Sequence, residues 1–463
     1  MNLQKVYKKI DEKFDEHLEQ IAEYVRVDNR ITNIENVFAL TRMLKKEIEE
    51  MGGRASIMDY GELPIIFGEI NFGADSSLLI YKNYDIIPPL SPRWKVHPFS
   101  AQIITAEGGE KVIMSRGISE PKGPLIATLN VLRTVIEEGK KLPVNIKFIS
   151  DGDRQLGSPS LTKLISDRKK DFLDIKTVFV PKFSQSESGN PILLLGVKGL
   201  ILIEMICSGG AWGGPIGESL HSSNASWIKS PVWRLIKALS TMVDENEKVL
   251  IKGFYDEVVD VIDLEERGIK SGKLEIIDFM RKQHAVRFKW NLPDEDLFRK
   301  HILTPTFNIS NILVRPPAYW SKLILPSEAR ASIDIRLVPD MEPSRIIEAV
   351  RDHLREHGYD DIEVVTHIQY PAWSTDSDDP AVRIIKDVYK DFGFDVEIHY
   401  SSTWSFPFYA FQKELGASLV VGGLGRGGKA FSFNEYATLD GIKLFEKSVA
   451  CFLDRFCKTA LRD

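Results

Sequence analysis

The sequence predicts an α/β protein with a mixed, mostly parallel sheet covered by helices and a smaller inserted α+β lid or dimerisation domain. Three observations lead to this prediction. The chain has 463 residues, more than one hydrophobic core usually supports, so two domains are expected. Short apolar runs alternate with amphipathic helices over residues 38–200 and again after Pro371. Between them, residues 197–206 and 329–338 alternate as half-buried strands do.

The first part of the chain carries the signals of a parallel α/β layer. Apolar residues three or four apart over 3–25 predict an amphipathic helix rather than a signal peptide. Residues 77–84, 144–150 and 176–181 are expected strands, with a helix over 123–138. Ligands usually bind at the carboxyl ends of such strands, so the loops after them are where we expect the site.

The middle of the chain predicts a smaller layer of strands and two helices. Ser230 is a plausible N-cap with Pro231 at the first helical position, and Gly358 is placed to end a second helix that begins near Met341. Residues 245–315 form an insertion for which the sequence gives no clear structure.

The α/β pattern returns near the C-terminus. A helix is expected from Asp379-Pro380 to Phe392, strands near 396–400 and 417–421, and a last amphipathic helix over 439–456. The predicted large domain is therefore discontinuous, formed by residues 1–199 and 371–463. Residues 200–370 form the inserted domain.

Composition excludes several classes of function. The net charge is −6 and no basic block is present, which argues against nucleic-acid binding. The longest apolar runs are far shorter than the about 20 residues that cross a bilayer, so no membrane contact is expected. Three cysteines offer no disulfide framework, and we expect a cytoplasmic protein.

Four segments with unusual polar residues follow the predicted strands. They are Lys82-Asn83-Tyr84-Asp85-Ile86-Ile87-Pro88-Pro89, Ser115-Arg116-Gly117-Ile118-Ser119-Glu120-Pro121-Lys122-Gly123, Asp151-Gly152-Asp153-Arg154-Gln155-Leu156-Gly157-Ser158 and Ala430-Phe431-Ser432-Phe433-Asn434-Glu435. These segments resemble the motifs G-H-Y-D-x-x-P-P, G-R-G-x-S-D-D-K-G, E-G-x-E-E-x-G-S and A-H-S-P-N-E. The motifs belong to the two-zinc carboxypeptidases and dipeptidases of the aminoacylase, carnosinase and succinyl-diaminopimelate desuccinylase type. Their order and spacing extend the resemblance over nearly the whole chain.

The resemblance assigns metal ligands to positions where this chain has other residues. The positions of the family's ligands hold, in chain order, Asn83, Glu120, Gln155, Lys182 (or Pro181) and Phe431. The general base is replaced by Arg154, which stays protonated and cannot accept a proton from water. Asp85 orients the first histidine in the family, so here we expect it to have lost its partner.

These departures predict no metal and no cofactor, with two zinc ions expected only if the ligands are rearranged. We expect Glu120 and Arg154 to form a salt bridge in the former metal cavity, or an ordinary structural ion pair. Asp151 and Asp153 are read as solvated loop carboxylates, a hard-cation site or anchors of the loop. Phe431 is expected to pack in the core, with a substrate platform as the alternative.

Four further residues match positions that contact substrate in the family. His221 corresponds to a histidine that reaches the partner subunit's site, and here ligand binding and helix packing are equally open. Asn308 and Arg336 match positions that hold substrate carboxylates, although Arg336 also suits a structural ion pair. Trp404 stands in a loop that the family fills with glycines, so it is expected to crowd the site.

Three functions are consistent with this sequence. The first is a family member that has lost metal binding and peptide hydrolysis and acts as a small-ligand-binding or partner subunit. The alternative is an active metal-dependent peptidase or amidohydrolase, of carboxypeptidase or dipeptidase type, with rearranged ligands. The third is metal-independent chemistry in the same pocket. A small, anionic or peptide ligand and a homodimer through the inserted domain are the partners that the resemblance implies.

Overall fold

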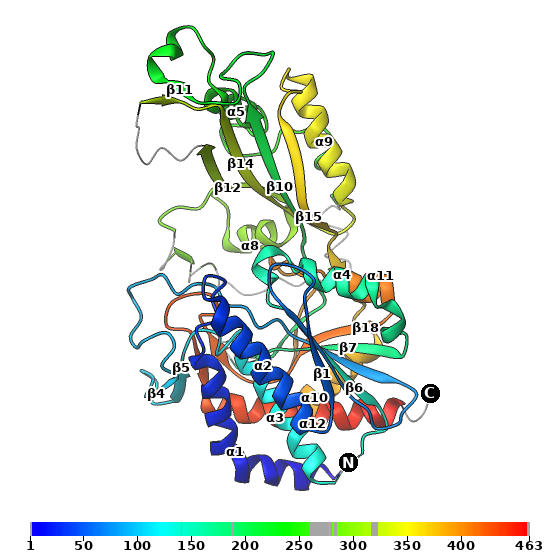
Figure 1. Ribbon diagram of the computed structural model, residues 1–463. Coiled ribbons are helices and arrows are strands. Elements are labelled where there is room, and N and C mark those ends of the chain that lie inside the picture. The colour runs from blue at the N-terminus through cyan, green and yellow to red at the C-terminus, as the bar shows by residue number, and fades with distance from the viewer. Residues whose placement is uncertain are drawn as a thin grey trace. The chain divides into compact units, whose positions relative to one another are not determined.

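The computed structural model describes residues 2–139, 141–186, 189–258, 277, 280–281, 285–315 and 323–460. The chain divides into two compact units (Figure 1). Unit 1 comprises residues Met1–Leu195, Thr375–Tyr400 and Phe408–Asp463, and unit 2 comprises Gly196–Ser374 and Ser401–Pro407. Unit 1 is discontinuous and unit 2 is inserted into it, so each is described by itself.

Unit 1 is built on an eight-stranded sheet with the order β1-β2-β6-β3-β7-β18-β8-β17. Its centre is parallel: β6 (Asn145–Ser150), β3 (Ser77–Tyr81), β7 (Ile175–Pro181) and β18 (Ser418–Gly422) run in one direction. Every residue of β3 and β6 is buried, as expected for strands covered on both faces. The mixed, mostly parallel sheet predicted from the sequence is confirmed.

The edges of this sheet add the antiparallel pairs. The strands β1 (Arg54–Met58) and β2 (Ile65–Ile70) pair with each other, and β2 pairs with β6, all antiparallel. At the other edge β8 (Ile192–Leu194) pairs antiparallel with β18 and parallel with β17 (Glu397–His399). The sequence had not predicted β1, β2 or β8.

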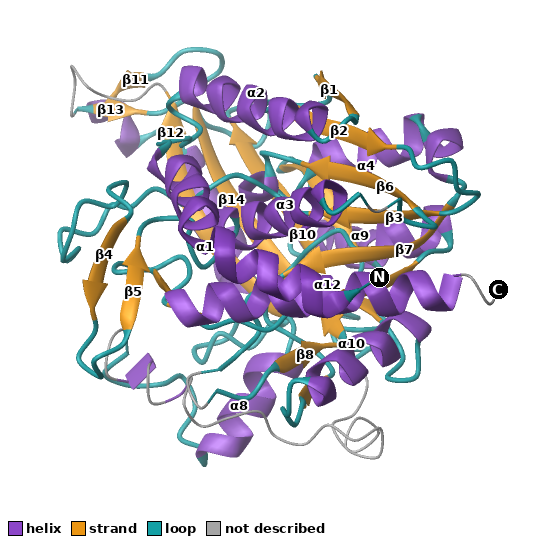
Figure 2. Cartoon of the chain, turned by 90° about the horizontal axis from the view of Figure 1, so that it is seen from below, coloured by secondary structure: helices purple, strands orange, loops and turns teal. Residues whose placement is uncertain are grey.

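Helices α1 (Leu3–Arg26), α3 (Lys122–Glu137) and α12 (Leu439–Ala460) pack against one another and form one layer over the strands (Figure 2). The predicted apolar stripe of α1 is buried there, because its residues recur every three or four positions. The other α-helices in the described part of unit 1 are α2 (Ile34–Glu50), α4 (Pro159–Asp167), α10 (Pro380–Asp391) and α11 (Tyr409–Leu415).

A second, four-stranded sheet of unit 1 positions two of the polar segments. Its order is β19-β20-β5-β4, with β4 (Gln102–Thr105), β5 (Lys111–Met114), β19 (Gly427–Gly428) and β20 (Tyr436–Thr438). Tyr436 pairs with Met114 in the antiparallel register of β20 and β5. The segment that ends at Glu435 therefore lies beside the segment that begins at Ser115, although the two are far apart in the chain.

Unit 2 contains an antiparallel sheet with the order β12-β14-β10-β15. The strands are β12 (Thr306–Arg315), β14 (Glu328–Leu337), β10 (Gly199–Ser208) and β15 (Glu363–Tyr370). Burial alternates along β14 residue by residue, so one face of the sheet packs on the core and the other is half-buried.

Helices α5 (Pro231–Thr241) and α9 (Pro343–Glu356) contribute to the hydrophobic core on the buried face. Gly358 has φ 73° just after α9, the left-handed conformation that favours glycine at a helix end. Within the insertion of unclear structure, α8 (Asp294–Leu303) and β12 are regular, and residues 259–276 lie outside the described residues.

Short strands complete unit 2. They are β9 (Gly196–Val197) with β16 (Trp373–Ser374), and β11 (Leu220–His221) with β13 (Ile324–Leu325). In the described parts of the chain, every helix is too short or too polar to span a bilayer.

Candidate functional site

Glu435 is the anchor of the segment that carries Glu120. Its carboxylate is fully buried and accepts a hydrogen bond from the Arg116 guanidinium at 2.8 Å. It also accepts from the backbone N–H groups of Gly117 at 3.1 Å and of Ser119 and Glu120 at 3.0 Å. Burial raises the pKa of Glu435 to about 7, although Arg116 and the three N–H groups act in the opposite direction. One side chain therefore fixes the path of residues 116–120.

Glu120 forms a buried ion pair with Lys82. The Lys82 Nζ lies 2.6 Å from Glu120 Oε1, and the two residues are 3% and 4% exposed. Burial lowers the pKa of Lys82, while the charge of Glu120 raises it. Sequence reasoning gave Lys82 no role and expected Arg154 as the partner of Glu120. The contact between Glu120 and Arg154 stays a prediction.

Lys182 adds a second ammonium group near Glu120. Burial lowers the pKa of Lys182 to about 8, with Glu120 raising it and the neighbouring charge of Lys82 lowering it further. Lys182 follows β7 directly, and Lys82 follows β3, its neighbour in the sheet. The ends of two adjacent parallel strands thus supply both lysines.

Asp85 has partners, contrary to the expectation that it had lost them. The Asn83 amide donates to Asp85 Oδ1 at 2.8 Å, and the backbone N–H of Gln155 donates to Asp85 Oδ2 at 2.9 Å. Burial raises the pKa of Asp85 to about 6, and the charge of Arg154 lowers it. The side chain that the resemblance places at the first ligand position therefore binds Asp85.

Asp151 and Asp153 are buried, so the interpretation as solvated loop carboxylates is wrong. The Tyr81 hydroxyl donates to Asp151 Oδ1 at 2.9 Å, and the backbone N–H of Ser160 donates to Asp153 Oδ2 at 3.1 Å. Burial raises the pKa of both groups, to about 6 for Asp151, where the charge of Asp85 adds to the effect, and to about 7 for Asp153, where the charge of Asp151 does so. These contacts fit the third interpretation, in which both anchor the loop that carries Arg154.

Arg154 and Phe431 lie together. The guanidinium carbon of Arg154 is 5.1 Å from the centre of the Phe431 ring, within the range of a cation–π contact. Phe431 is only half-buried and has φ 65°, so the expectation that it packs in the core is wrong. The two residues that the resemblance matches to the family's general base and last histidine are therefore in contact, as a cation and an aromatic ring.

The four residues expected to bind substrate lie in unit 2. The Asn308 amide donates to Asp334 Oδ2 at 2.6 Å, and Arg336 Nε lies 3.5 Å from Asp334 Oδ1, so both converge on one carboxylate. His221 is exposed and its Nδ1 accepts from the backbone N–H of Ser223 at 3.3 Å. Trp404 is half-buried, and its carbonyl accepts from the Lys198 N–H at 2.8 Å.

The residues that the resemblance places at the ligand positions do not fit two zinc ions. Asn83 is engaged with Asp85, and Glu120 is neutralised by Lys82 with Lys182 nearby. Zinc requires several imidazole, thiolate or carboxylate donors, and ammonium groups repel it. Across the part of the chain that the structure describes, no group of three or more His, Cys, Asp or Glu side chains is arranged to hold a metal ion.

Known proteins are similar over most of the chain. The family model described as peptidase family M20/M25/M40 matches residues 79–455. The Cys-Gly metallodipeptidase DUG1 of Candida albicans is 27% identical over 389 residues, which cover 80% of this chain and 77% of that protein. The human Beta-Ala-His dipeptidase is 24% identical over 379 residues, which cover 76% of this chain and 71% of that protein.

A solved structure shares both fold and sequence. The M20 family metallo-carboxypeptidase Sso-CP2 from Sulfolobus solfataricus superposes with a TM-score of 0.82 and 28% identity, covering 96% of this chain and 99% of the other. The yeast di-peptidase Dug1p also reaches a TM-score of 0.82, at 20% identity.

These comparisons correct one expectation from the sequence. Several of the similar proteins are metallodipeptidases or a metallo-carboxypeptidase by name, which overturns the expectation that no metal cofactor accompanies this chain. They also support the alternative of a metal-dependent peptidase better than a loss of hydrolysis. Because the family model covers residues 79–455 and includes all four polar segments, the chain belongs to peptidase family M20/M25/M40.

Proposed function

We propose that the chain is a metal-dependent peptidase or amidohydrolase, of carboxypeptidase or dipeptidase type, whose metal ligands are rearranged relative to the family. The observation that carries the proposal is the match of the family model over residues 79–455, with metallodipeptidases among the similar proteins. The substrate class that these relatives suggest is a short peptide.

The architecture around the site supports this proposal. Glu435 holds residues 116–120 through four hydrogen bonds, and Asp153 holds the start of α4. Such supports keep loops at strand ends in one conformation, which a catalytic site needs. Since the former ligand positions do not fit the family's metals, the metal has to use other donors, and we assign no hydrolytic step to individual residues.

A second function is favoured by the ion pair of Lys82 and Glu120. Glu120 is the one carboxylate among the residues matched to the family's ligands. The ammonium group of Lys82 lies 2.6 Å from it, where a metal bound to Glu120 would have to lie. This observation supports binding of a small ligand or peptide without hydrolysis. Both functions require a short peptide or similar molecule to bind, so they differ in turnover and in metal content.

Metal content and turnover on the same preparation separate the two functions. Protein purified from cells grown with zinc is first assayed for bound metal. Its hydrolysis of Cys-Gly and β-Ala-His dipeptides is then measured in the presence of zinc, manganese or cobalt. The proposal expects stoichiometric metal and turnover that a chelator abolishes. Absence of turnover with every metal, together with calorimetric binding of a dipeptide, would instead establish the second function. The absence of both turnover and dipeptide binding would refute both functions.

A matched pair of variants guards against a contaminating peptidase. Glu435→Gln weakens the anchor of residues 116–120 and is expected to reduce turnover. Glu107→Gln changes an exposed side chain and is expected to leave it unchanged. Equal activity in both variants would mean that the measured hydrolysis does not belong to this site.

We also propose that the protein is a cytoplasmic homodimer formed through unit 2. The strand β12 lies at the edge of its sheet and exposes Ile309, Ile312 and Leu313. Exposed apolar residues on an unpaired edge strand favour pairing with a second chain. Light scattering after size exclusion is expected to give twice the mass of 52.5 kDa. Replacing Ile312 by lysine should yield the monomer, and a wild-type monomer would refute the dimer.

A further inference from the structure

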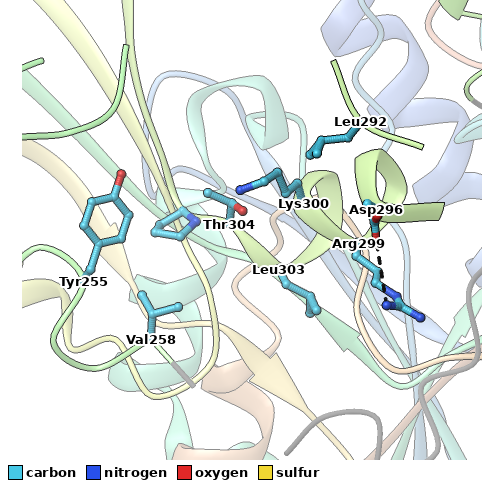
Figure 3. A pocket seen from close by; sticks show the side chains of 9 residues that line it. Tyr255, Val258, Leu292, Asp296, Arg299, Lys300, Leu303 and Thr304 are labelled. Carbon is cyan, nitrogen blue, oxygen red and sulfur yellow. Dashed lines mark ion pairs between the residues drawn. The ribbon is translucent and has the colours of Figure 1, made fainter. Parts of the chain in front are cut away.

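Unit 2 contains a cavity that none of the functions above uses. It has a volume of about 450 Å³ and lies beside α8, between that helix and residues 255–258 (Figure 3). This volume falls within the range of cavities that hold small molecules, about 300–1,000 Å³. The cavity is therefore large enough for a ligand of several carbon atoms.

The walls of the cavity are mainly apolar. Val258, Leu292, Leu303 and Pro305 line it, together with the ring of Tyr255. Leu303 is buried at the end of α8, where it packs with Phe298 and Ile302. Apolar walls favour an aliphatic or aromatic body, because its transfer from water gains about 25 cal/mol for each Å² buried.

Among the described residues that line the cavity, the charged groups leave an excess of positive charge. Asp296 and Arg299 face each other at 3.7 Å on one side, so their charges offset one another (Figure 3). Lys300 is the next residue of α8, and within the described ranges no carboxylate lies in ion-pair distance of its ammonium group. Its Nζ lies 4.9 Å from the centre of the Trp290 ring instead.

A buried lysine holds the end of α8 beside this side of the cavity, and burial lowers its pKa to about 7. Lys198 donates to the carbonyl oxygens of His301 at 2.9 Å and of Thr304 at 2.7 Å, and Thr304 lines the cavity. A ligand that is negative at one end is thus drawn to the side of the cavity formed by Lys300 and Thr304. The hydroxyl of Thr304 is a further donor on that side.

We propose that this cavity binds a small carboxylate with an apolar tail. The carboxylate pairs with Lys300, and the tail lies against Val258, Leu292 and Leu303. The proposal does not depend on hydrolysis, because all of these residues belong to unit 2 and none is among the former ligand positions. The ligand class follows from the combination of apolar walls with a lysine that has no carboxylate partner among the residues that the structure describes.

Calorimetry with sodium octanoate on the full-length protein tests the proposal. Octanoate is expected to bind one site per chain, whereas acetate, which has no tail, and octylamine, which has the wrong charge, are expected not to bind. Lys300→Met keeps the length of the side chain and removes its charge, so it should weaken octanoate binding about tenfold. Lys237→Met, on the exposed face of α5, is the matched control and should bind as the wild type does.

A second variant tests the walls of the cavity independently of charge. Leu292→Trp places a larger side chain in the cavity and should abolish binding, with thermal melting used to show that the variant is folded. Equal binding of octanoate and octylamine, unchanged affinity in Lys300→Met, or full binding in a folded Leu292→Trp variant would each overturn the proposal.

Discussion

The Lys82 ammonium group lies 2.6 Å from the Glu120 carboxylate. Glu120 stands where the resemblance to two-zinc peptidases expects an aspartate that bridges the two metals. The pair is buried, so each charge depends on the other for its stabilisation. The backbone N–H of Glu120 donates to the Glu435 carboxylate at 3.0 Å. The geometry of this ion pair is therefore set by two separate parts of the chain.

Removing Lys82 should destabilise the protein strongly. Lys82→Met removes the ion-pair partner of the buried Glu120 and leaves only Lys182 nearby, so the free energy of unfolding is expected to fall by about 3–5 kcal/mol. Urea denaturation measures this change. The double variant Lys82→Met with Glu120→Gln should recover much of the loss. Lys8→Met, at an exposed pair with Glu12, should change stability by less than about 1 kcal/mol. A single variant as stable as the wild type would contradict the assignment.

The contact between Arg154 and Phe431 is measurable by a double-mutant cycle. Arg154→Met and Phe431→Leu each remove one side of the cation–π contact and also disturb other neighbours. The cycle cancels those other effects and should return a coupling energy of about 0.5–1 kcal/mol. A coupling energy of zero would mean that the two side chains do not stabilise each other.

Buried carboxyl groups should make stability fall as pH rises toward neutrality. Burial raises the pKa of Asp85 and Asp151 to about 6 and of Asp153 and Glu435 to about 7, above their ordinary values. Between about pH 4 and pH 7 the folded protein then holds more protons than the unfolded chain, so these groups stabilise the fold at low pH and progressively less as pH rises.

Asp153→Asn tests this pH dependence at one group. The amide cannot ionise, and its oxygen still accepts from the Ser160 N–H. The stability of the variant relative to the wild type should therefore rise between pH 4 and pH 7, as followed by chemical denaturation at each pH. Asp59→Asn, at a solvent-facing carboxylate, should show no such trend. A constant difference for Asp153→Asn would show that its pKa is not raised.

Restoring the family's residues should add metal sites. The combined variant Asn83→His, Glu120→Asp, Arg154→Glu, Gln155→Glu, Phe431→His and Lys182→Asp supplies the missing donors and removes the cations beside them. Its zinc content by mass spectrometry should exceed that of the wild type. The same variant with Lys182 retained is the control, and it should hold less zinc because an ammonium group stays at the site. Equal zinc in wild type and full variant would contradict the prediction.

The regular elements with strong periodicity could be predicted from the sequence. The helix expected over 3–25 is α1 (Leu3–Arg26), and the strand expected near 417–421 is β18 (Ser418–Gly422). Such elements are visible because apolar residues recur with the period of a helix or fill a short buried strand. The strand expected over 77–84 ends at Tyr81, because Lys82 and the residues after it leave the sheet to form the site.

The site itself was predicted only in part. The four polar segments were found from their sequence, and the structure brings 115–120 and 435 together in unit 1. The sequence did not identify Lys82 as the ion-pair partner of Glu120. The two residues are 38 positions apart, and pairing at that separation depends on the order of the strands in the sheet. A lysine directly after a strand of five buried residues was nevertheless a signal, since a buried ammonium group needs a counter-charge.

The strands β9 and β16 lie where the longer segment of unit 2 is inserted into the chain of unit 1. Trp373 pairs antiparallel with Val197, and the Thr375 N–H donates to the Leu195 carbonyl at 2.8 Å. The longer segment of unit 2, Gly196–Ser374, thus leaves and rejoins the chain of unit 1 at two points that are one strand spacing apart, about 5 Å. A tight turn of a few residues is long enough to join those points, so evolution can exchange or enlarge the module between them while the host keeps its chain path.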